Sequence, residues 1–449
     1  MTASSAAYPM RSVWLCLAVI ALTLFSEAAD ALRRPVYGGT LSVSFSEPLT
    51  TLDPARAMTF TDWFAVTNLH RSLFRLRADG TPEIDLLAEA PVGESSGQSW
   101  LLRLKRNVRF HNGRILRARD VVRSLRRLRG TVHGWVPKRV RLTVVNQWAV
   151  RLQFRQPLSS LDLGLLLASP ALSIVGDVRG RVGLGPFRLH AGGSSGSGRK
   201  EFVFAAQHYR GRPYLDGLNL QVLESTDAVI EAFHYGHTDV VFVESPRYRT
   251  PIELPGPRRE TVGLLLRESP ATADALGRTR VLSHVPRAQI VHQLPGRTWL
   301  ATSFFPWSGA RGWAEDGGTV QNVRWFVAAP NDLESLAQSV AALLGETASP
   351  WPVQLLDPER FLHSVARTTD ASSRWDALLL SWCHIDPWPT AAQRTLGSLG
   401  GDPDGAFSRD RPVWIPLLDR ARTAVHTGKT RGLRWSYVGS LSVEGAWQP

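Results

Sequence analysis

The chain has 449 residues, more than one hydrophobic core organises, so at least two domains are expected. Hydrophobic residues make up 43% and charged residues 20%, which is typical of a globular protein. The formal net charge is +13, almost all from arginine. Two explanations of this charge are open. One is a compositional bias of the sequence, and the other is binding to an anionic ligand or surface such as a membrane leaflet or nucleic acid. The arginines form no single basic stripe, and no known nucleic-acid module is recognisable. We therefore expect no nucleic-acid partner.

Residues 1–31 have the composition of a signal peptide. Residues 13–25 form an apolar run too short to span a bilayer comfortably, and residues 29–31 (Ala-Asp-Ala) form a small-residue cleavage site. We therefore expect an exported, periplasmic protein. Cleavage would remove Cys16 and leave Cys383 alone, so no internal disulfide is expected. No later stretch is long and apolar enough for a transmembrane helix.

Periodic patterns predict the elements of the first half. Residues 38–45 predict a strand, and residues 61–73 predict a helix with Thr61 as its cap. Residues 100–104 alternate as in a half-buried strand, and 108–110 form a second short alternating run before a tight turn. Residues 121–128 then recur at helical spacing.

Later patterns continue this mixed architecture. Residues 140–154 predict two more strands, and residues 161–175 predict a helix. Residues 333–344 predict an amphipathic helix, whereas 353–356 and 377–380 predict buried strands of an α/β lobe.

The segment from Leu104 to Ser124 carries an amino-acid motif that is more informative than its periodicity. They contain Leu-Lys-x-x-Val-x-Phe-His-Asn-Gly, followed by Asp-Val and Ser. This run resembles the signature region of the extracellular solute-binding proteins of family 5, the peptide and nickel class. Residues 183–187 (Gly-Leu-Gly-Pro-Phe) and 233–239 resemble further landmarks of that family. Beyond about Glu260 the resemblance thins, so the C-terminal half is divergent.

The resemblance implies an α/β fold of the bilobed periplasmic-binding-protein type (type II), with mixed sheets and discontinuous lobes joined by a hinge. The implied division is residues 1–31 signal peptide, 32–66 first part of lobe I, 67–182 inserted domain II, 183–262 second part of lobe I, 263–430 divergent lobe II, and 431–449 C-terminal return segment.

The resemblance also suggests which residues contact a ligand. Residues 381–389 resemble the Gly-Trp-x-x-Asp segment of peptide binders, in which an acid pairs with the amino group of the ligand. Here Ile385 stands at that position and Asp386 is shifted by one, so either the loop is repacked and Asp386 serves, or amine recognition is lost. The candidate ligand-binding residues are Glu47, Trp63, Phe305, Trp307, Trp382, Cys383, His384, Asp386 and Trp388.

Other chemistry has weaker sequence support. Cys383, His384 and Asp386 offer metal-ligand types, but neighbours along one strand alternate faces, which favours a cleft wall over a metal or haem-iron site. Residues 193–200 faintly resemble a phosphate-binding loop, yet a hairpin loop explains them better. No catalytic motif is found, and we expect no enzyme, no cofactor and no metal.

The expected function is capture of a small, peptide-like solute between two lobes for delivery to an ABC permease at the inner membrane. The protein would act as a monomer. One alternative is a degenerate binding-protein fold that serves as an envelope interaction protein without transport. A second alternative is a binder of haem or a metal chelate, and oligosaccharide stays open as a ligand class.

Overall fold

The computed structural model describes residues 35–190, 198–243, 252–266, 298–300, 327–330, 333–344, 352–356, 377–388, 390–391, 394–395 and 414–448. The expected signal peptide and the 193–197 part of the loop before Lys200 lie outside these residues. No helix among the described residues is long and apolar enough to cross a membrane.

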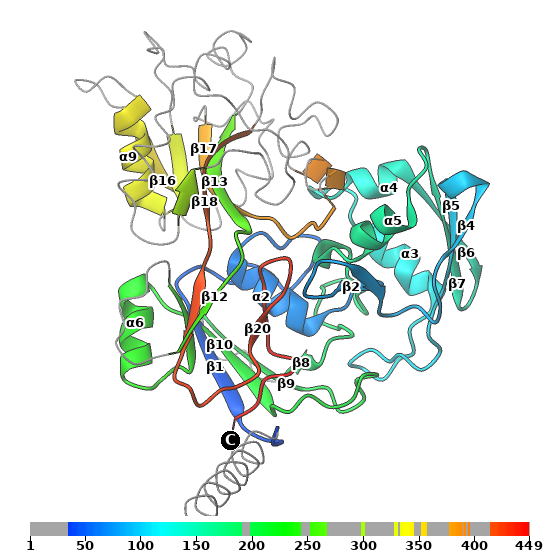
Figure 1. The fold of residues 1–449 in the computed structure, drawn as a ribbon, viewed down its shortest axis with the longest axis horizontal. Coiled ribbons are helices and arrows are strands. Elements are labelled where there is room, and N and C mark those ends of the chain that lie inside the picture. Colours follow the sequence, from blue (N-terminus) through cyan, green and yellow to red (C-terminus); the bar gives the residue numbers. More distant parts are fainter. Residues whose placement is uncertain are drawn as a thin grey trace, which may run out of the picture.

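A seven-stranded sheet forms the lower part of the molecule in Figure 1. Its order is β12-β19-β11-β1-β10-β9-β8, and β1 is parallel to both of its neighbours, β10 and β11. The predicted first strand is thereby confirmed at the centre of a sheet. The bounds are β1 Thr40–Phe45, β8 Phe187–Leu189, β9 Arg199–Phe204, β10 Gly217–Val222, β11 Val240–Val243, β12 Ile252–Pro255 and β19 Thr423–His426, with helix α6 at Thr226–His234.

Helix α2 (Phe60–Leu69) packs on this sheet through Phe60, Phe64 and Leu69. The predicted cap was wrong, because Thr59 and not Thr61 closes the first turn in a capping box with Asp62. The predicted end at residue 73 was also wrong. The carbonyl of Leu69 accepts a hydrogen bond from the backbone of Gly185 (2.9 Å), so a distant segment ends the helix there.

A four-stranded sheet of order β4-β5-β7-β6 carries the next part of the chain. The two strands predicted between residues 140 and 154 are confirmed, but the run at 108–110 makes only an isolated bridge between Arg109 and Ile115. The helix predicted over 161–175 ends at Leu167, and a 3-10 turn at Pro170–Leu172 (η2) follows because proline begins it. The bounds are β4 Val92–Glu94, β5 Ser99–Arg103, β6 Val140–Asn146, β7 Ala149–Phe154, α3 Ala118–Arg126, α4 Trp135–Arg139, α5 Ser160–Leu167 and the 3-10 turn η1 Ser95–Gly97.

A six-stranded mixed sheet of order β14-β18-β13-β17-β15-β16 forms the upper part of Figure 1, with helix α9 (Glu334–Leu344) beside it. The predicted helix and both predicted strands are confirmed. β16 is not fully buried as expected, since it is an edge strand and Leu355 is exposed. The bounds are β13 Glu260–Leu266, β14 Thr298–Leu300, β15 Val327–Pro330, β16 Val353–Leu356, β17 Ala377–Cys383 and β18 Trp414–Arg420.

Three connections join the six-stranded sheet to the rest of the chain. The chain enters it between β12 and β13 and leaves it between β18 and β19. In addition, the segment after β17 reaches the core beneath α4, where Ile385, Trp388 and Ala391 are buried. Two short pairs complete the fold: β2 (Phe74–Leu76) with β3 (Pro82–Ile84), and β20 (Arg434–Trp435) with β21 (Leu441–Ser442). The domain division expected from the sequence stays a prediction.

Candidate ligand-binding junction

We call the place where the two larger sheets meet the junction. It comprises the ends of β13, β17 and β18 on one side and the loop after β1 on the other. Glu260, the first residue of β13, is buried between two arginines. Arg420 donates to its Oε1 at 2.5 Å, and Arg422 donates to both carboxylate oxygens at 2.8 Å. The hydroxyl of Ser381 on β17 also donates to Glu260.

Glu47 ties this cluster to the seven-stranded sheet. Its Oε1 is paired with Arg422, while its Oε2 accepts from the backbone N–H of Phe60 at 3.1 Å. The Arg422 guanidinium also lies 4.6 Å from the centroid of the Phe60 ring. Glu47 is therefore an internal counter-ion at the start of α2.

The charges of this cluster stabilise one another. Burial alone would raise the pKa of Glu260, but Arg420 and Arg422 together lower it well below its usual range. Burial would likewise lower the pKa of Arg422, yet Glu260 and Glu47 raise it well above its usual value. Glu260 and Arg422 are consequently ionised at neutral pH, and each needs its partners because it is withdrawn from water.

His384 lies next to this cluster and is fully buried. Its Nε2 is 2.7 Å from the hydroxyl of Thr261, which donates to the Asp419 carboxylate at 2.6 Å. Burial, and then the positive charge of Arg259, lowers the pKa of His384 well below its usual value. Burial raises the pKa of Asp419 to about 6, although hydrogen bonds from Thr261 and Arg258 act in the other direction.

Asp386 faces the core beneath α4 and is 3% exposed. Its Oδ1 accepts from the hydroxyl of Ser169, and its Oδ2 accepts from the hydroxyl of Thr395 at 3.1 Å. Thr395 is also 3.3 Å from His133 Nδ1 and 3.2 Å from the indole nitrogen of Trp135. Asp386 thus joins the segment after β17 to the domain that carries α4 and α5.

The structure brings only some of the predicted ligand residues together. Glu47, Cys383 and His384 lie at or beside the junction, and Trp382 belongs to β17. Trp63 and Trp388 are buried in the core that surrounds the four-stranded sheet. Phe305 and Trp307 lie outside the described residues. As a ligand-contact set, these nine residues stay a prediction.

The sequence did not point to Glu260, Arg420 or Arg422, which hold the junction together. Nothing local distinguishes these three charges from the many other charges of the chain. The ion pairs of these three residues join positions 160 to 375 apart in the sequence. Only the fold shows that they meet.

The signature histidine, by contrast, has a clear structural role. His111 Nδ1 accepts from the Gly183 N–H at 3.1 Å, and its Nε2 is 3.0 Å from the Gly185 carbonyl oxygen. These partners fix the tautomer with the proton on Nε2. A side chain at Gly183 would begin 1.9 Å from the carbonyl oxygen of Leu69, so the glycine landmark allows a close approach to the end of α2.

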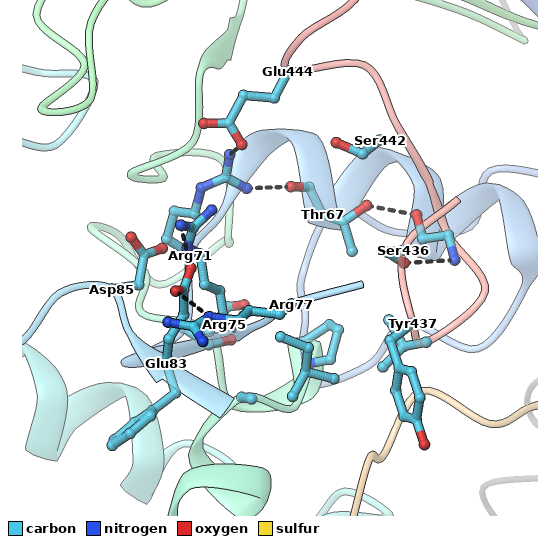
Figure 2. Close-up of a pocket in the computed structure, with 18 of the residues that line it drawn as sticks. Thr67, Arg71, Arg75, Arg77, Glu83, Asp85, Ser436, Tyr437, Ser442 and Glu444 are labelled. Carbon is cyan, nitrogen blue, oxygen red and sulfur yellow. Dashed lines mark hydrogen bonds and ion pairs between the residues drawn. The ribbon is translucent and has the colours of Figure 1, made fainter. Parts of the chain in front are cut away.

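A separate cavity of about 520 Å³ lies between the end of α2, the β2–β3 pair and the C-terminal segment (Figure 2). Arg71 in this cavity donates to Glu444 at 2.8 Å, and both Arg75 and Arg77 are paired with Glu83. Glu444 and Glu83 are thus already paired with arginines of the same cavity.

Metal ligation has no support in the described part of the chain. No group of three or more His, Cys, Asp or Glu side chains is arranged there to hold a metal ion. Cys383 is a free cysteine whose pKa burial raises well above its usual value.

Comparison with known proteins shows which family part of the chain resembles. Residues 84–268 match the family model described as bacterial extracellular solute-binding proteins, family 5 Middle. The resemblance to family 5 is thereby confirmed over this region, and the matched family is one of extracellular solute-binding proteins. None of the curated proteins compared with the chain matches it.

Solved structures with a similar fold cover most of the chain. The oligopeptide-binding protein AppA of Bacillus subtilis, in complex with a nonapeptide, superposes with a TM-score of 0.73 at 12% identity, covering 93% of this chain and 100% of that chain. NikA of Staphylococcus aureus, in complex with Ni(L-His)2, gives 0.70 at 15% identity over 91% and 100%. MoaA from A. tumefaciens R10, in complex with mannopinic acid, gives 0.69 at 18% identity over 91% and 99%. The predicted bilobed type II periplasmic-binding-protein fold is confirmed.

Proposed function

We propose that this protein captures a small solute at the junction between its two larger sheets and delivers it to the permease of an ABC importer. The single observation behind this proposal is that the fold matches, over more than nine-tenths of the chain, solute-binding proteins that hold ligands. The mechanism is closure of the lobes around a ligand that binds the closed form more tightly than the open form. The protein is exported to the periplasm by its N-terminal segment and catalyses no reaction.

The first candidate for the ligand is a peptide-like solute, because several of the structural relatives hold oligopeptides or dipeptides. The amino group of such a ligand needs a carboxylate. Glu47 already has Arg422 as its counter-ion, and Asp386 accepts from Ser169 and Thr395. We therefore propose that the ligand is held mainly by apolar and backbone contacts near Trp382 and Cys383, and not by an ammonium–Asp386 pair.

A thermal-shift screen of the full chain tests this function, since a ligand that binds only the native state must raise its stability. Di- and oligopeptides, oligosaccharides, haem and nickel-histidine form the screen. We expect a saturable rise of several degrees with one ligand class. A cooperative melt that no ligand class shifts would contradict solute capture. A rise with nickel-histidine or haem that His384→Ala abolishes would instead establish the metal-chelate alternative.

The second candidate function is interaction at the envelope without transport. One observation favours it: the two acidic residues expected to contact a ligand are both used in internal contacts that join parts of the fold. In that case the thermal-shift screen stays flat, while the protein co-purifies with an envelope partner.

A further inference from the structure

A groove of about 860 Å³ opens on the domain of the four-stranded sheet, between the end of α3, helix α4 and strands β6 and β7. Six cationic side chains line it, and none of its lining residues is acidic. They are Arg126, Arg129, Lys138, Arg139, Arg141 and Arg155. Figure 1 shows these elements at the outer end of the molecule, away from the six-stranded sheet. The groove is thus separate from the junction.

Four of these six cations have no counter-ion among the described residues. Arg129, Lys138, Arg141 and Arg155 are exposed, and no described carboxylate pairs with them. Within the described part of the chain, Arg126 donates only to the Leu142 carbonyl oxygen, at 3.3 Å. Like charges held this close together repel one another, so the groove carries a positive field that an anionic partner would relieve.

Apolar side chains accompany this charge. β6 is an edge strand of the sheet, and Val144 and Val145 near its end are 45% and 44% exposed. Val144 lines the groove itself. Exposed valines beside the cationic side chains of the groove match the two parts of a lipid surface, which are the phosphate groups and the acyl chains beneath them.

Nucleic acid matches this groove less well. Binding of single strands relies on exposed aromatic faces for base stacking. Phe154 is the one aromatic residue among the described residues that line the groove, and it is half-buried. Valines would add nothing to a contact with phosphates and bases alone.

We propose that this groove, together with the Val144–Val145 end of β6, binds the anionic surface of a lipid bilayer. Its guanidinium groups contact lipid phosphates, which they match as planar donors, and the valines enter the interfacial layer. The chain would thereby be concentrated at the membrane by a face that does not take part in solute capture.

Co-sedimentation of the full chain with vesicles tests this proposal. One set contains equal parts of phosphatidylglycerol and phosphatidylcholine, and the other contains phosphatidylcholine alone. The groove variant carries Arg129→Gln, Lys138→Gln and Arg141→Gln. The matched control carries Arg179→Gln, Arg188→Gln and Lys429→Gln, which remove the same charge from exposed positions outside the groove. Thermal melts of both triple variants serve as the control that they fold.

We expect the groove variant to bind the anionic vesicles more weakly by a factor on the order of 100, because each basic residue near such a surface contributes about five-fold. The control should change little, and added salt should weaken the binding of the unmodified chain. Val144→Thr with Val145→Thr should reduce binding about four-fold for each methyl group replaced.

Equal losses in the two triple variants would overturn the proposal, since binding would then depend only on net charge. Groove-dependent binding of a DNA or RNA oligonucleotide with no binding to either vesicle would overturn it as well. Equal binding to the neutral and anionic vesicles would contradict the role of the arginines.

Discussion

Glu47 and Arg422 form an ion pair although 375 positions separate them in the chain. The pair joins the loop after β1 to the connection between β18 and β19, and Arg422 continues to Glu260 at the start of β13. One arginine therefore links both sheets that meet at the junction. The charges of the junction thus form a continuous bridge between the two sheets.

Glu260→Gln tests how strongly the protein depends on this cluster. Removal of the carboxylate leaves two arginines buried without their shared counter-ion, so the free energy of unfolding should fall by about 3 kcal/mol. Urea denaturation measures it. The control is Glu201→Gln, which removes a half-exposed partner of Arg199 and should change stability by less than about 0.5 kcal/mol. Similar losses in both variants would show that the cluster has no special role.

His111 should make the protein less stable in mild acid. Burial lowers its pKa to about 4 from an ordinary value near 6.5, so the folded state resists protonation that the unfolded state accepts. The stability it contributes is present above pH 6.5 and is lost as the pH falls from 6.5 towards 4. His111→Gln should reduce this loss by up to about 3 kcal/mol. Chemical denaturation at several pH values measures the slope, and an unchanged slope would contradict the assignment.

Asp419 should act in the opposite direction over nearly the same range. Because burial raises its pKa to about 6, the folded state binds a proton between pH 4 and 6 that the unfolded state has released. Stability from this group therefore decreases as the pH rises through that window. Asp419→Asn keeps an acceptor for Thr261 and should remove this decrease, so the variant should lose more stability than the parent between pH 6 and 4. Parallel curves for parent and variant would rule this out.

Gly185→Ala tests the glycine landmark. A methyl group there would begin 2.3 Å from the Asn68 carbonyl oxygen, which is backbone and cannot give way cheaply. We expect a loss of about 3 kcal/mol or more in the free energy of unfolding. Gly445→Ala is the control, since the nearest atom would lie 4.0 Å away. A Gly185→Ala protein as stable as the control would mean that the turn can move.

Asp386→Asn separates a structural role from a ligand-binding one. If Asp386 mainly holds Ser169 and Thr395, the melting temperature of the ligand-free protein should fall by several degrees. The affinity for any ligand found in the screen should then change less than three-fold. A large loss of affinity with an unchanged melting temperature would show instead that Asp386 contacts the ligand.

The sequence predicted the elements whose causes are local. The strands between residues 140 and 154 and the helix over 333–344 follow from their own periodicity. The end of α2 does not follow from local periodicity, because Leu73 continues the apolar pattern. The helix ends earlier, where the Gly185 N–H binds the Leu69 carbonyl oxygen. The predicted second strand at 108–110 failed for a similar reason, since that run turns back on Ile115 and makes a single bridge.

The candidate site was less accessible to sequence reasoning. The resemblance directed attention to residues 381–389, and His384 and Asp386 proved to make hydrogen bonds inside the protein. Which charges surround them depends on strand pairing between distant segments, such as β13 with β17 and β18. Local patterns carry no information about such pairing.

Small-angle X-ray scattering of the full chain, alone and with the solute selected by the thermal-shift screen, tests the central claim most directly. Capture by closure predicts that the radius of gyration decreases when the ligand is added and that the change saturates at one ligand per chain. A ligand that binds and stabilises the protein while the scattering curve stays the same would contradict capture between the lobes.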